Sequence, residues 1–173
     1  MKYIKLFENF SSPSTNVRNK LRSIVSDIKS KYKGGKPFFD ALDDRIKDIN
    51  NRDMIYDLVK GCENEWIATS GEFGDVLYHM YKQGKFKCKG VLVFNGKMLT
   101  QGFGVSFWYP KDFDISNKEY VYVDDSYFSG NTVNKIKEFL IDENSTIKNV
   151  LVIYDGSLNK NNSVKSFFRY YDE

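Results

Sequence analysis

Apolar runs of strand length recur in the second half of this 173-residue chain, at residues 90–94, 120–123 and 149–154. They read Gly-Val-Leu-Val-Phe, Tyr-Val-Tyr-Val and Asn-Val-Leu-Val-Ile-Tyr, without the alternating charged residues of a strand that is exposed on one face. Segments with helical spacing, 75–83 and 132–141, lie between them. This alternation predicts an α/β fold with a mainly parallel sheet that is flanked by helices on both faces.

The length favours a single domain over residues 1–173. Residues 1–60 are predicted to form a helical N-terminal extension or hood, because their apolar residues recur at helical spacing. Ser14 or Thr15 is expected to cap the first helix, and Gly34-Gly35 to end it. A second helical pattern follows Pro37 and runs on to residue 59, with a break expected at residues 50–51. Residues 61–156 form the expected core, and 157–173 an apolar tail.

Composition excludes several classes of protein. The 26 Lys and Arg residues and 23 Asp and Glu residues leave a net charge of +3, which argues against a strongly basic nucleic-acid arm, although a weak basic patch stays open. We find no apolar run of the roughly 18 residues that a membrane-spanning helix needs. With two cysteines and one histidine, a Cys/His zinc site is nearly excluded. We therefore expect a reduced, cytoplasmic protein.

Open α/β sheets bind ligands at the carboxyl ends of their strands, so the segments after each predicted strand are the candidates for a site. A short strand at residues 65–68 is expected to lead into a turn at 69–74. Asn95-Gly96 is typical of a hairpin turn. The alternative prediction is that residues 97–104 form a mobile loop. The segments 124–131 and 155–161 complete the set.

One of these segments carries a motif with its own chemistry. A buried strand runs into Asp124-Asp125, and Ser129-Gly130-Asn131-Thr132 then opens a helix. A helix start presents unpaired backbone N–H groups and the positive end of the helix dipole, and a glycine there lets the backbone close around an anion. The two carboxylates suit sugar hydroxyls or the water shell of Mg²⁺. Together they predict a site for a sugar phosphate.

This motif resembles the phosphoribosyl pyrophosphate (PRPP) signature of type I phosphoribosyltransferases. In that family a strand leads into two acidic residues, three variable residues, Thr or Ser, Gly, one variable residue and Thr. Asp124, Asp125, Ser129, Gly130 and Thr132 match it position by position. The resemblance implies that the two acids bind the ribose hydroxyls. It also implies that they bind Mg²⁺ through water or through those hydroxyls. The loop from Phe128 to Thr132, which includes Asn131, would then surround the 5-phosphate.

The order of elements extends the resemblance over about residues 40–154. The segment Thr69, Ser70, Gly71 and Glu72 takes the place of the family's pyrophosphate-binding loop. Residues 97–104 take the place of its mobile loop, which makes Lys97 a candidate catalytic cation. Both assignments rest on order along the chain.

The resemblance implies a glycosyltransferase that moves phosphoribosyl from PRPP to a nitrogenous base and releases pyrophosphate, with Mg²⁺, in nucleotide metabolism. Two departures stand beside it. Phe128 occupies the position where some members carry an acid that acts as a base toward a purine, and any hood must come from residues 1–60. These departures favour the alternative, a regulatory module that binds PRPP or a nucleotide without turnover. The sequence does not identify the acceptor base. It also does not determine the oligomeric state, for which a homodimer is one option.

Overall fold

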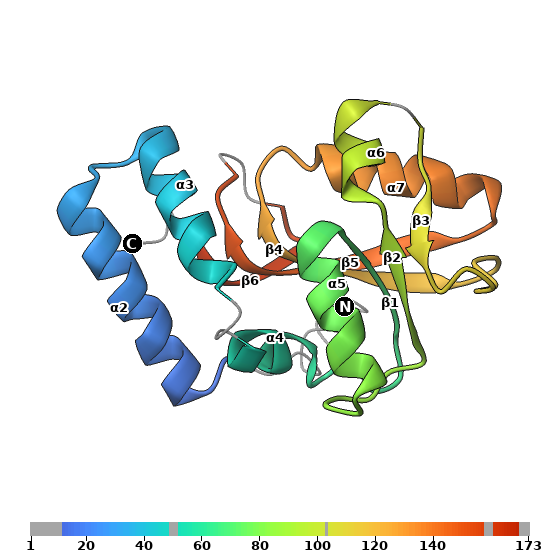
Figure 1. Cartoon of the computed structure of the whole chain (residues 1–173), viewed down its shortest axis with the longest axis horizontal. Helices are drawn as coiled ribbons and strands as arrows, with labels where there is room; N and C mark the ends of the chain where they lie inside the picture. Colours follow the sequence, from blue (N-terminus) through green and yellow to red (C-terminus); the bar gives the residue numbers. More distant parts are fainter. Residues whose placement is uncertain (1–11, 49–51, 103, 158–160, 170–173) are drawn as a thin grey trace.

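The computed structural model describes residues 12–48, 52–102, 104–157 and 161–169. A six-stranded sheet with the order β3-β2-β1-β4-β5-β6 forms its centre (Figure 1). Its strands are β1 (Trp66–Ser70), β2 (Gly90–Phe94), β3 (Phe107–Tyr109), β4 (Glu119–Tyr127), β5 (Thr146–Asp155) and β6 (Val164–Arg169). All neighbouring strands are parallel except β2 and β3, which are antiparallel.

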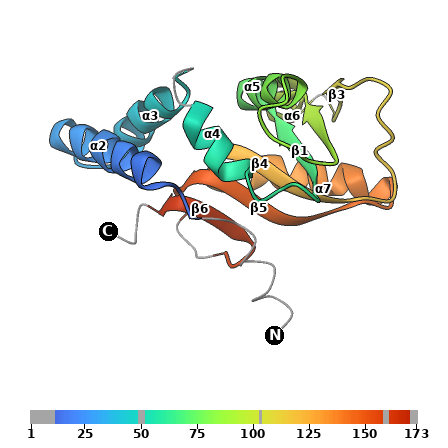
Figure 2. The same cartoon turned by 90° about the horizontal axis from the view of Figure 1, so that it is seen from below.

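Helices cover both faces of the sheet. Helices α2 (Thr15–Lys31), α3 (Gly35–Ile46), α4 (Arg52–Val59) and α5 (Gly71–Lys82) lie on one side (Figure 2). Helix α7 (Asn131–Asp142) and the short α6 (Gly96–Gln101) contribute to the core on the other side. Side chains alternate across the strands, so Val121 and Val123 enter the first core and Tyr120 and Tyr122 the second. The prediction of an α/β fold with a mainly parallel sheet and an N-terminal helical part is confirmed.

The N-terminal helices follow the sequence pattern closely. The side chain of Ser14 accepts a hydrogen bond from the backbone N–H of Val17 and caps α2, as predicted. The helix ends at Lys31, with Tyr32 as its C-cap, so the two glycines do not end it as predicted; Gly34 is the N-cap of α3 and Gly35 its first residue. The break expected at residues 50–51 lies outside the described residues. No helix within the described ranges is long and apolar enough to cross a membrane.

Two predicted loops are regular structure, which corrects the sequence interpretation. The turn expected at residues 69–74 is absent, because β1 runs through Ser70 and α5 begins directly at Gly71. Asn95-Gly96 does not form a hairpin turn, since the side chain of Asn95 accepts hydrogen bonds from the N–H groups of Lys97 and Met98 and starts α6. The return strand β3 follows only after that helix.

The apolar tail is also a structural element. Residues 164–169 form β6, which pairs in parallel with β5 from Val150↔Val164 to Asp155↔Arg169. Phe167 and Phe168 pack against the core beneath the N-terminal helices. Their half-burial explains why the tail is richer in aromatic residues than a solvated chain end would be.

Candidate functional site at the carboxyl edge of the sheet

Strand β4 extends further than its neighbour β1, and this difference creates the candidate site. The pairing of β1 with β4 ends at Ala68↔Tyr122, whereas the pairing of β4 with β5 continues to Tyr127↔Asp155. Asp124 and Asp125 therefore lie in the part of β4 that β5 supports and β1 does not. The predicted acid pair therefore stands at the carboxyl edge of the sheet.

The expectation that both acids follow the strand is wrong, although Asp124 is only partly buried. Both are residues of β4, and Asp125 is only 7% exposed. The reason is that β5 is ten residues long and continues the backbone hydrogen bonding of β4 past the last apolar residue, Val123. A pattern of apolar residues cannot reveal a strand that is extended by its neighbour.

A chain of hydrogen bonds fixes Asp124. The hydroxyl of Tyr122 lies 2.7 Å from Oδ2 of Asp124 and 2.7 Å from the hydroxyl of Ser70. Oδ1 of Asp124 accepts a hydrogen bond of 2.8 Å from the backbone N–H of Asp125. Burial and the neighbouring charge of Asp125 raise the pKa of Asp124 well above its usual value. The chain joins the predicted pyrophosphate segment to the predicted ribose-binding acids through a tyrosine that the sequence did not single out.

Asp125 faces the N-terminal helices. The hydroxyl of Ser126 donates to its Oδ1 at 3.1 Å, and Asp43 of α3 lies near enough to act on it electrostatically. Burial and then the charge of Asp43 raise the pKa of Asp125, while Lys47 opposes this rise. Adjacent acids of one strand thus have different neighbours, because consecutive side chains of a strand point to opposite faces, but the two carboxyl groups still interact with each other.

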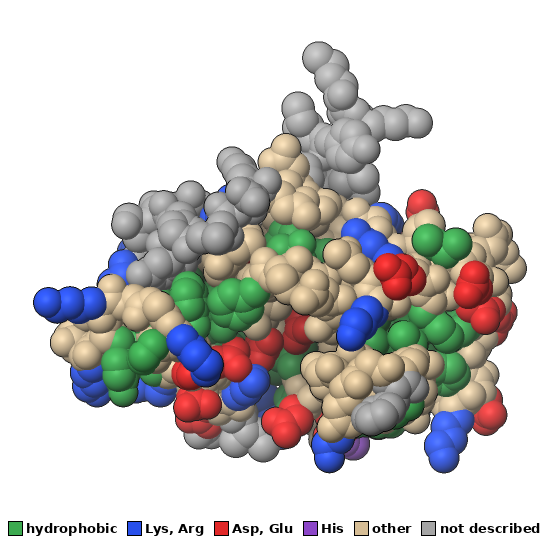
Figure 3. Space-filling model, turned by 90° about the horizontal axis from the view of Figure 1, so that it is seen from above, with side chains coloured by type: hydrophobic (Ala, Val, Ile, Leu, Met, Phe, Trp, Pro, Cys, Tyr) green, Lys and Arg blue, Asp and Glu red, His purple; other side chains and the backbone are tan. Residues whose placement is uncertain are grey.

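Helix α3 brings two further charged residues to this edge. The Nζ of Lys47 lies 2.6 Å from Oδ2 of Asp43, and the hydroxyl of Tyr154 donates to Oδ1 of Asp43 at 3.0 Å. Seen from above, acidic side chains gather near the middle of this face with basic ones among them (Figure 3). The sequence interpretation missed Asp43 and Lys47. The one sequence feature that could have identified them is their position beside the buried stripe of a helix that was expected to form a hood.

Aromatic rings border the same region. Phe128, 41% exposed, makes edge-to-face contacts with Phe39 of α3 at 5.2 Å and with Tyr154 of β5 at 5.6 Å between ring centroids. Such contacts add roughly 0.5–1.5 kcal/mol beyond the burial of area. Phe128 therefore holds the loop after β4 against α3 and keeps one ring partly exposed beside the acids.

The predicted phosphate loop has the expected conformation at its glycine. Gly130 precedes α7 with a φ of +77°, and no side chain caps the helix at this residue. The positive φ favours glycine, and a Cβ at Gly130 would lie 2.5 Å from the hydroxyl of Tyr127, so the Tyr127 side chain would have to shift. Ser129 accepts a hydrogen bond of 3.3 Å from the N–H of Asn131, and the side chain of Thr132 is half-buried in the first turn. Ser129 and Asn131 on either side of Gly130 are exposed to solvent.

The predicted pyrophosphate segment is only partly available. Thr69 is fully buried, and its methyl group contacts the position where a Cβ on Gly74 would stand. Ser70 points toward Tyr122, and Glu72 is exposed on the first turn of α5. Gly71 has a φ of +64°, and its Cα would lie 3.1 Å from a Cβ on Gly96. The starts of α5 and α6 thus pack backbone to backbone, which brings two predicted loops together.

Lys97 makes no described side-chain contact with this cluster. It lies exposed on α6, where its backbone N–H donates to the side chain of Asn95. We find no described hydrogen bond or ion pair that directs its ammonium toward the acid pair, within the parts of the chain that the structure describes. The structure brings Asp124, Asp125, Ser70 and the Gly130 loop to one edge, while Lys97 is exposed on α6, whose start packs against Gly71.

The residues also allow a test for Mg²⁺. No group of three or more His, Cys, Asp or Glu side chains forms a metal cage among the described residues. Mg²⁺ usually keeps several waters and binds through one or two carboxylates together with substrate phosphates. Asp124 and Asp125 provide that smaller set of ligands, so the site fits a metal that arrives with a phosphate ligand.

Comparisons with known proteins place the chain near one group of structures by shape. No protein-family model matches, and no curated protein sequence matches either. An adenine phosphoribosyltransferase from Thermoanaerobacter pseudethanolicus is 15% identical with a TM-score of 0.47, over 75% of this chain and 86% of that chain. A hypoxanthine phosphoribosyltransferase from Staphylococcus aureus is 11% identical with a TM-score of 0.45, over 97% and 82%.

A purine phosphoribosyltransferase from Pyrococcus horikoshii Ot3 is 16% identical with a TM-score of 0.44, over 67% of this chain and 79% of that chain. The structural neighbours are thus phosphoribosyltransferases. Because their TM-scores lie below 0.5, we infer nothing from them about the activity of this chain.

Proposed function

We propose that the chain binds PRPP at the carboxyl edge of its sheet and transfers the phosphoribosyl group to a nitrogenous base, with release of pyrophosphate. The observation that supports this most directly is the succession within β4 and α7. Two carboxylates, Asp124 and Asp125, stand at the edge of the sheet, and an uncapped helix start at Gly130 follows five residues later. Sugar hydroxyls suit the first part and a phosphate the second.

Each part of the ligand has a proposed place. Asp124 and Asp125 accept hydrogen bonds from the ribose hydroxyls. Residues 128–132, from Phe128 to Thr132, surround the 5-phosphate with backbone N–H groups. Ser70, Gly71 and Glu72 border the diphosphate, while Thr69 supports them from inside the core. We propose residues 1–60 as the hood, of which α3 covers the site next to Phe128.

The proposed chemistry breaks the bond between C1 of the ribose and the diphosphate oxygen, with positive charge developing on the sugar ring. The base nitrogen forms the new bond to C1, its N–H proton passes to solvent or to a nearby base, and pyrophosphate leaves with the electron pair. Mg²⁺ held by Asp124 and Asp125 would neutralise the departing charge. The protein's own contribution is to hold the ribose and the diphosphate in register.

The experiment is calorimetry with PRPP and Mg²⁺, followed by an assay of pyrophosphate release with a panel of purine and pyrimidine bases. We expect binding by the natural chain and a loss of about tenfold or more in the Asp124→Asn/Asp125→Asn variant, because hydrogen bonds to charged groups contribute about 1.5–3 kcal/mol each. The control Asp114→Asn removes an exposed acid that precedes the first residue of β4. No binding by the folded natural chain would refute the proposal.

The position of Phe128 supports a second candidate function. Phe128 stands where an acidic base would act, and its ring is packed between Phe39 and Tyr154. A site without that base fits a regulatory module that binds PRPP or a nucleotide without turnover. Binding of PRPP with no pyrophosphate release for any base would favour this second function.

A further inference from the structure

The candidate site has a surplus of negative charge for a ligand that is itself an anion. Asp124, Asp125, Asp43 and Glu72 all lie at or near the carboxyl edge of the sheet. A diphosphate carries several further negative charges, so like charges would repel unless a cation stands between them. The question is which basic side chain of the chain itself takes that position.

Lys47 pairs with Asp43 at 2.6 Å and lies within electrostatic range of both proposed subsites. It directly follows α3, and its backbone N–H donates to the carbonyl oxygen of Asp43 at 2.9 Å. Although its partial burial opposes the charged form, the hydrogen bond to Asp43 and the charges of Asp125 and Glu72 raise its pKa. The negative charges of Asp125 on β4 and of Glu72 in the first turn of α5 therefore both attract the ammonium. These are the elements proposed to hold the ribose and the diphosphate.

The ammonium is held in place from the core. An exposed pair between residues four apart on a helix contributes little stability by itself. Here Oδ2 of Asp43 lies 2.6 Å from the ammonium of Lys47. Oδ1 of Asp43 accepts a hydrogen bond of 3.0 Å from the hydroxyl of Tyr154. Tyr154 is fully buried, so its hydroxyl fixes the carboxylate that in turn orients Lys47. This arrangement gives the lysine a direction before any ligand binds.

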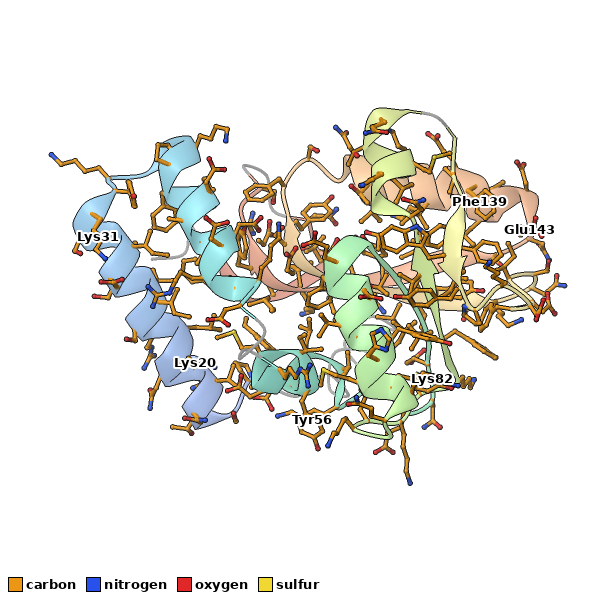
Figure 4. All side chains as sticks on the ribbon, in the orientation of Figure 1. Lys20, Lys31, Tyr56, Lys82, Phe139 and Glu143 are labelled. Carbon is orange, nitrogen blue, oxygen red and sulfur yellow. The ribbon has the colours of Figure 1, made fainter. Side chains whose placement is uncertain are left out.

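Several other lysines of the described residues lie elsewhere in the fold. Lys97 is exposed on α6. Lys82 lies at the opposite end of α5 from Gly71 (Figure 4). Lys20 pairs with Asp53 of α4, and Lys31 pairs with Asp27 of its own helix. Lys135 donates to the carbonyl oxygen of Leu99 and so links α7 to α6.

We propose that Lys47, oriented by Asp43 and Tyr154, binds the diphosphate group of the ligand, in the role that the sequence pattern assigned to Lys97. This inference rests on the proposed function, and it names the cation that makes an acid-rich edge accept an anion. When the ligand binds, the ammonium turns one of its hydrogen bonds from Asp43 toward a diphosphate oxygen. Asp43 is then a positioning residue and keeps its hydrogen bond from Tyr154.

The test compares Lys47→Met with Lys97→Met by calorimetry, with PRPP, inorganic pyrophosphate and ribose 5-phosphate as separate probes, each with Mg²⁺. We expect Lys47→Met to weaken PRPP and pyrophosphate about tenfold or more, the range for one lost hydrogen bond to a charged group. Ribose 5-phosphate, which has no diphosphate, should keep its affinity within about twofold. Lys97→Met should leave all three unchanged.

Two further variants keep the test decisive. Lys47→Arg retains the positive charge and should recover most of the affinity for pyrophosphate, which guards against a loss through misfolding. Asp43→Asn retains the acceptor for Tyr154 but weakens the hold on Lys47, and it should produce a smaller loss. A thermal melt of each variant establishes that it is folded.

The outcomes separate this inference from the function on which it rests. A folded natural chain that binds none of the three probes refutes the proposed function. If the natural chain binds PRPP and Lys47→Met binds it equally well, the assignment of Lys47 is wrong. The assignment is equally wrong if ribose 5-phosphate weakens as much as pyrophosphate, since Lys47 would then act on the whole site and not on the diphosphate.

Discussion

The hydroxyl oxygens of Ser70 and Tyr122 lie 2.7 Å apart and join the end of β1 to the acid pair of β4. Tyr122 is 1% exposed, and the same hydroxyl lies 2.7 Å from Asp124. When Asp124 is ionised, Tyr122 must donate to it, and Ser70 must then donate to Tyr122, because each hydroxyl has one proton. The carboxylate that we propose for ribose binding is therefore oriented from the neighbouring strand.

We expect Tyr122→Phe to weaken PRPP about tenfold, because it removes the hydrogen bond that orients Asp124 and leaves Ser70 without that partner. Calorimetry and a thermal melt measure the two effects. Tyr120→Phe is the matched control, since its buried hydroxyl donates to the carbonyl oxygen of Ile115 near the other end of β4. Comparable losses of affinity in both variants would contradict a specific role for Tyr122.

We expect Asp125→Asn to stabilise the fold at neutral pH. Burial and the charge of Asp43 raise the pKa of Asp125 in the folded state, so its ionisation opposes folding above that pKa. Asparagine keeps the acceptor for Ser126 without the charge. A gain of about 1 kcal/mol would raise Tm by about 2–4 °C in a chain of this length.

The pH dependence checks the cause of this gain. As pH falls through the raised pKa of Asp125 toward the ordinary value of 3.8, the natural carboxyl becomes neutral and the advantage of the variant should disappear. Thermal melts at pH 7 and near pH 4 measure it. A gain of equal size at both pH values would show that charge is not its origin.

Asp57→Asn should have the opposite effect. Asp57 accepts hydrogen bonds from the backbone N–H of Ser14 at 2.7 Å and from Lys60 at 3.2 Å, and these bonds outweigh its burial and lower its pKa. Its ionised form therefore stabilises the fold above the unfolded pKa, and this contribution is lost as pH falls through the folded pKa.

We expect Asp57→Asn to lower the free energy of unfolding at pH 7 by about 1–3 kcal/mol, because it removes the charge from a buried hydrogen-bonded group. The difference from the natural chain should shrink below pH 4. Denaturant unfolding at both pH values measures it, and PRPP binding should be unchanged, since Asp57 joins α4 to the start of α2.

We expect Gly130→Ala to be more harmful than Gly84→Ala. Both glycines have positive φ, +77° and +71°, which costs an alanine about 1–2 kcal/mol. A Cβ at Gly84 meets nothing within 4 Å, whereas one at Gly130 would meet the hydroxyl of Tyr127 at 2.5 Å. The difference in the free energy of unfolding between the two variants isolates this contact.

The double variant Tyr127→Phe/Gly130→Ala tests the explanation further. Removal of the hydroxyl should recover the part of the loss that exceeds the loss in Gly84→Ala. Phosphate-ligand affinity should fall in Gly130→Ala, because the loop must shift to admit the methyl group. Equal unfolding free energies for Gly84→Ala and Gly130→Ala would show that the loop adapts without cost.

The amino-acid sequence by itself determined the main elements of this protein. Apolar runs and helical spacing identified β2, β4, β5, α2 and α7, because burial of apolar side chains at a regular period is a local property of the chain. The acid pair and the glycine of the phosphate loop were likewise readable as a motif, since all its members lie within nine residues from 124 to 132.

Only the tertiary structure decided which residues share the site. Asp43 and Lys47 reach Asp125 because α3 packs against the end of β4, across about eighty residues of chain. The extension of β4 past Val123 depends on the length of β5, and the link from Ser70 to Asp124 depends on the register of β1 beside Tyr122. These contacts join distant parts of the chain through strand pairing and helix packing, so a single sequence contains no local pattern that announces them.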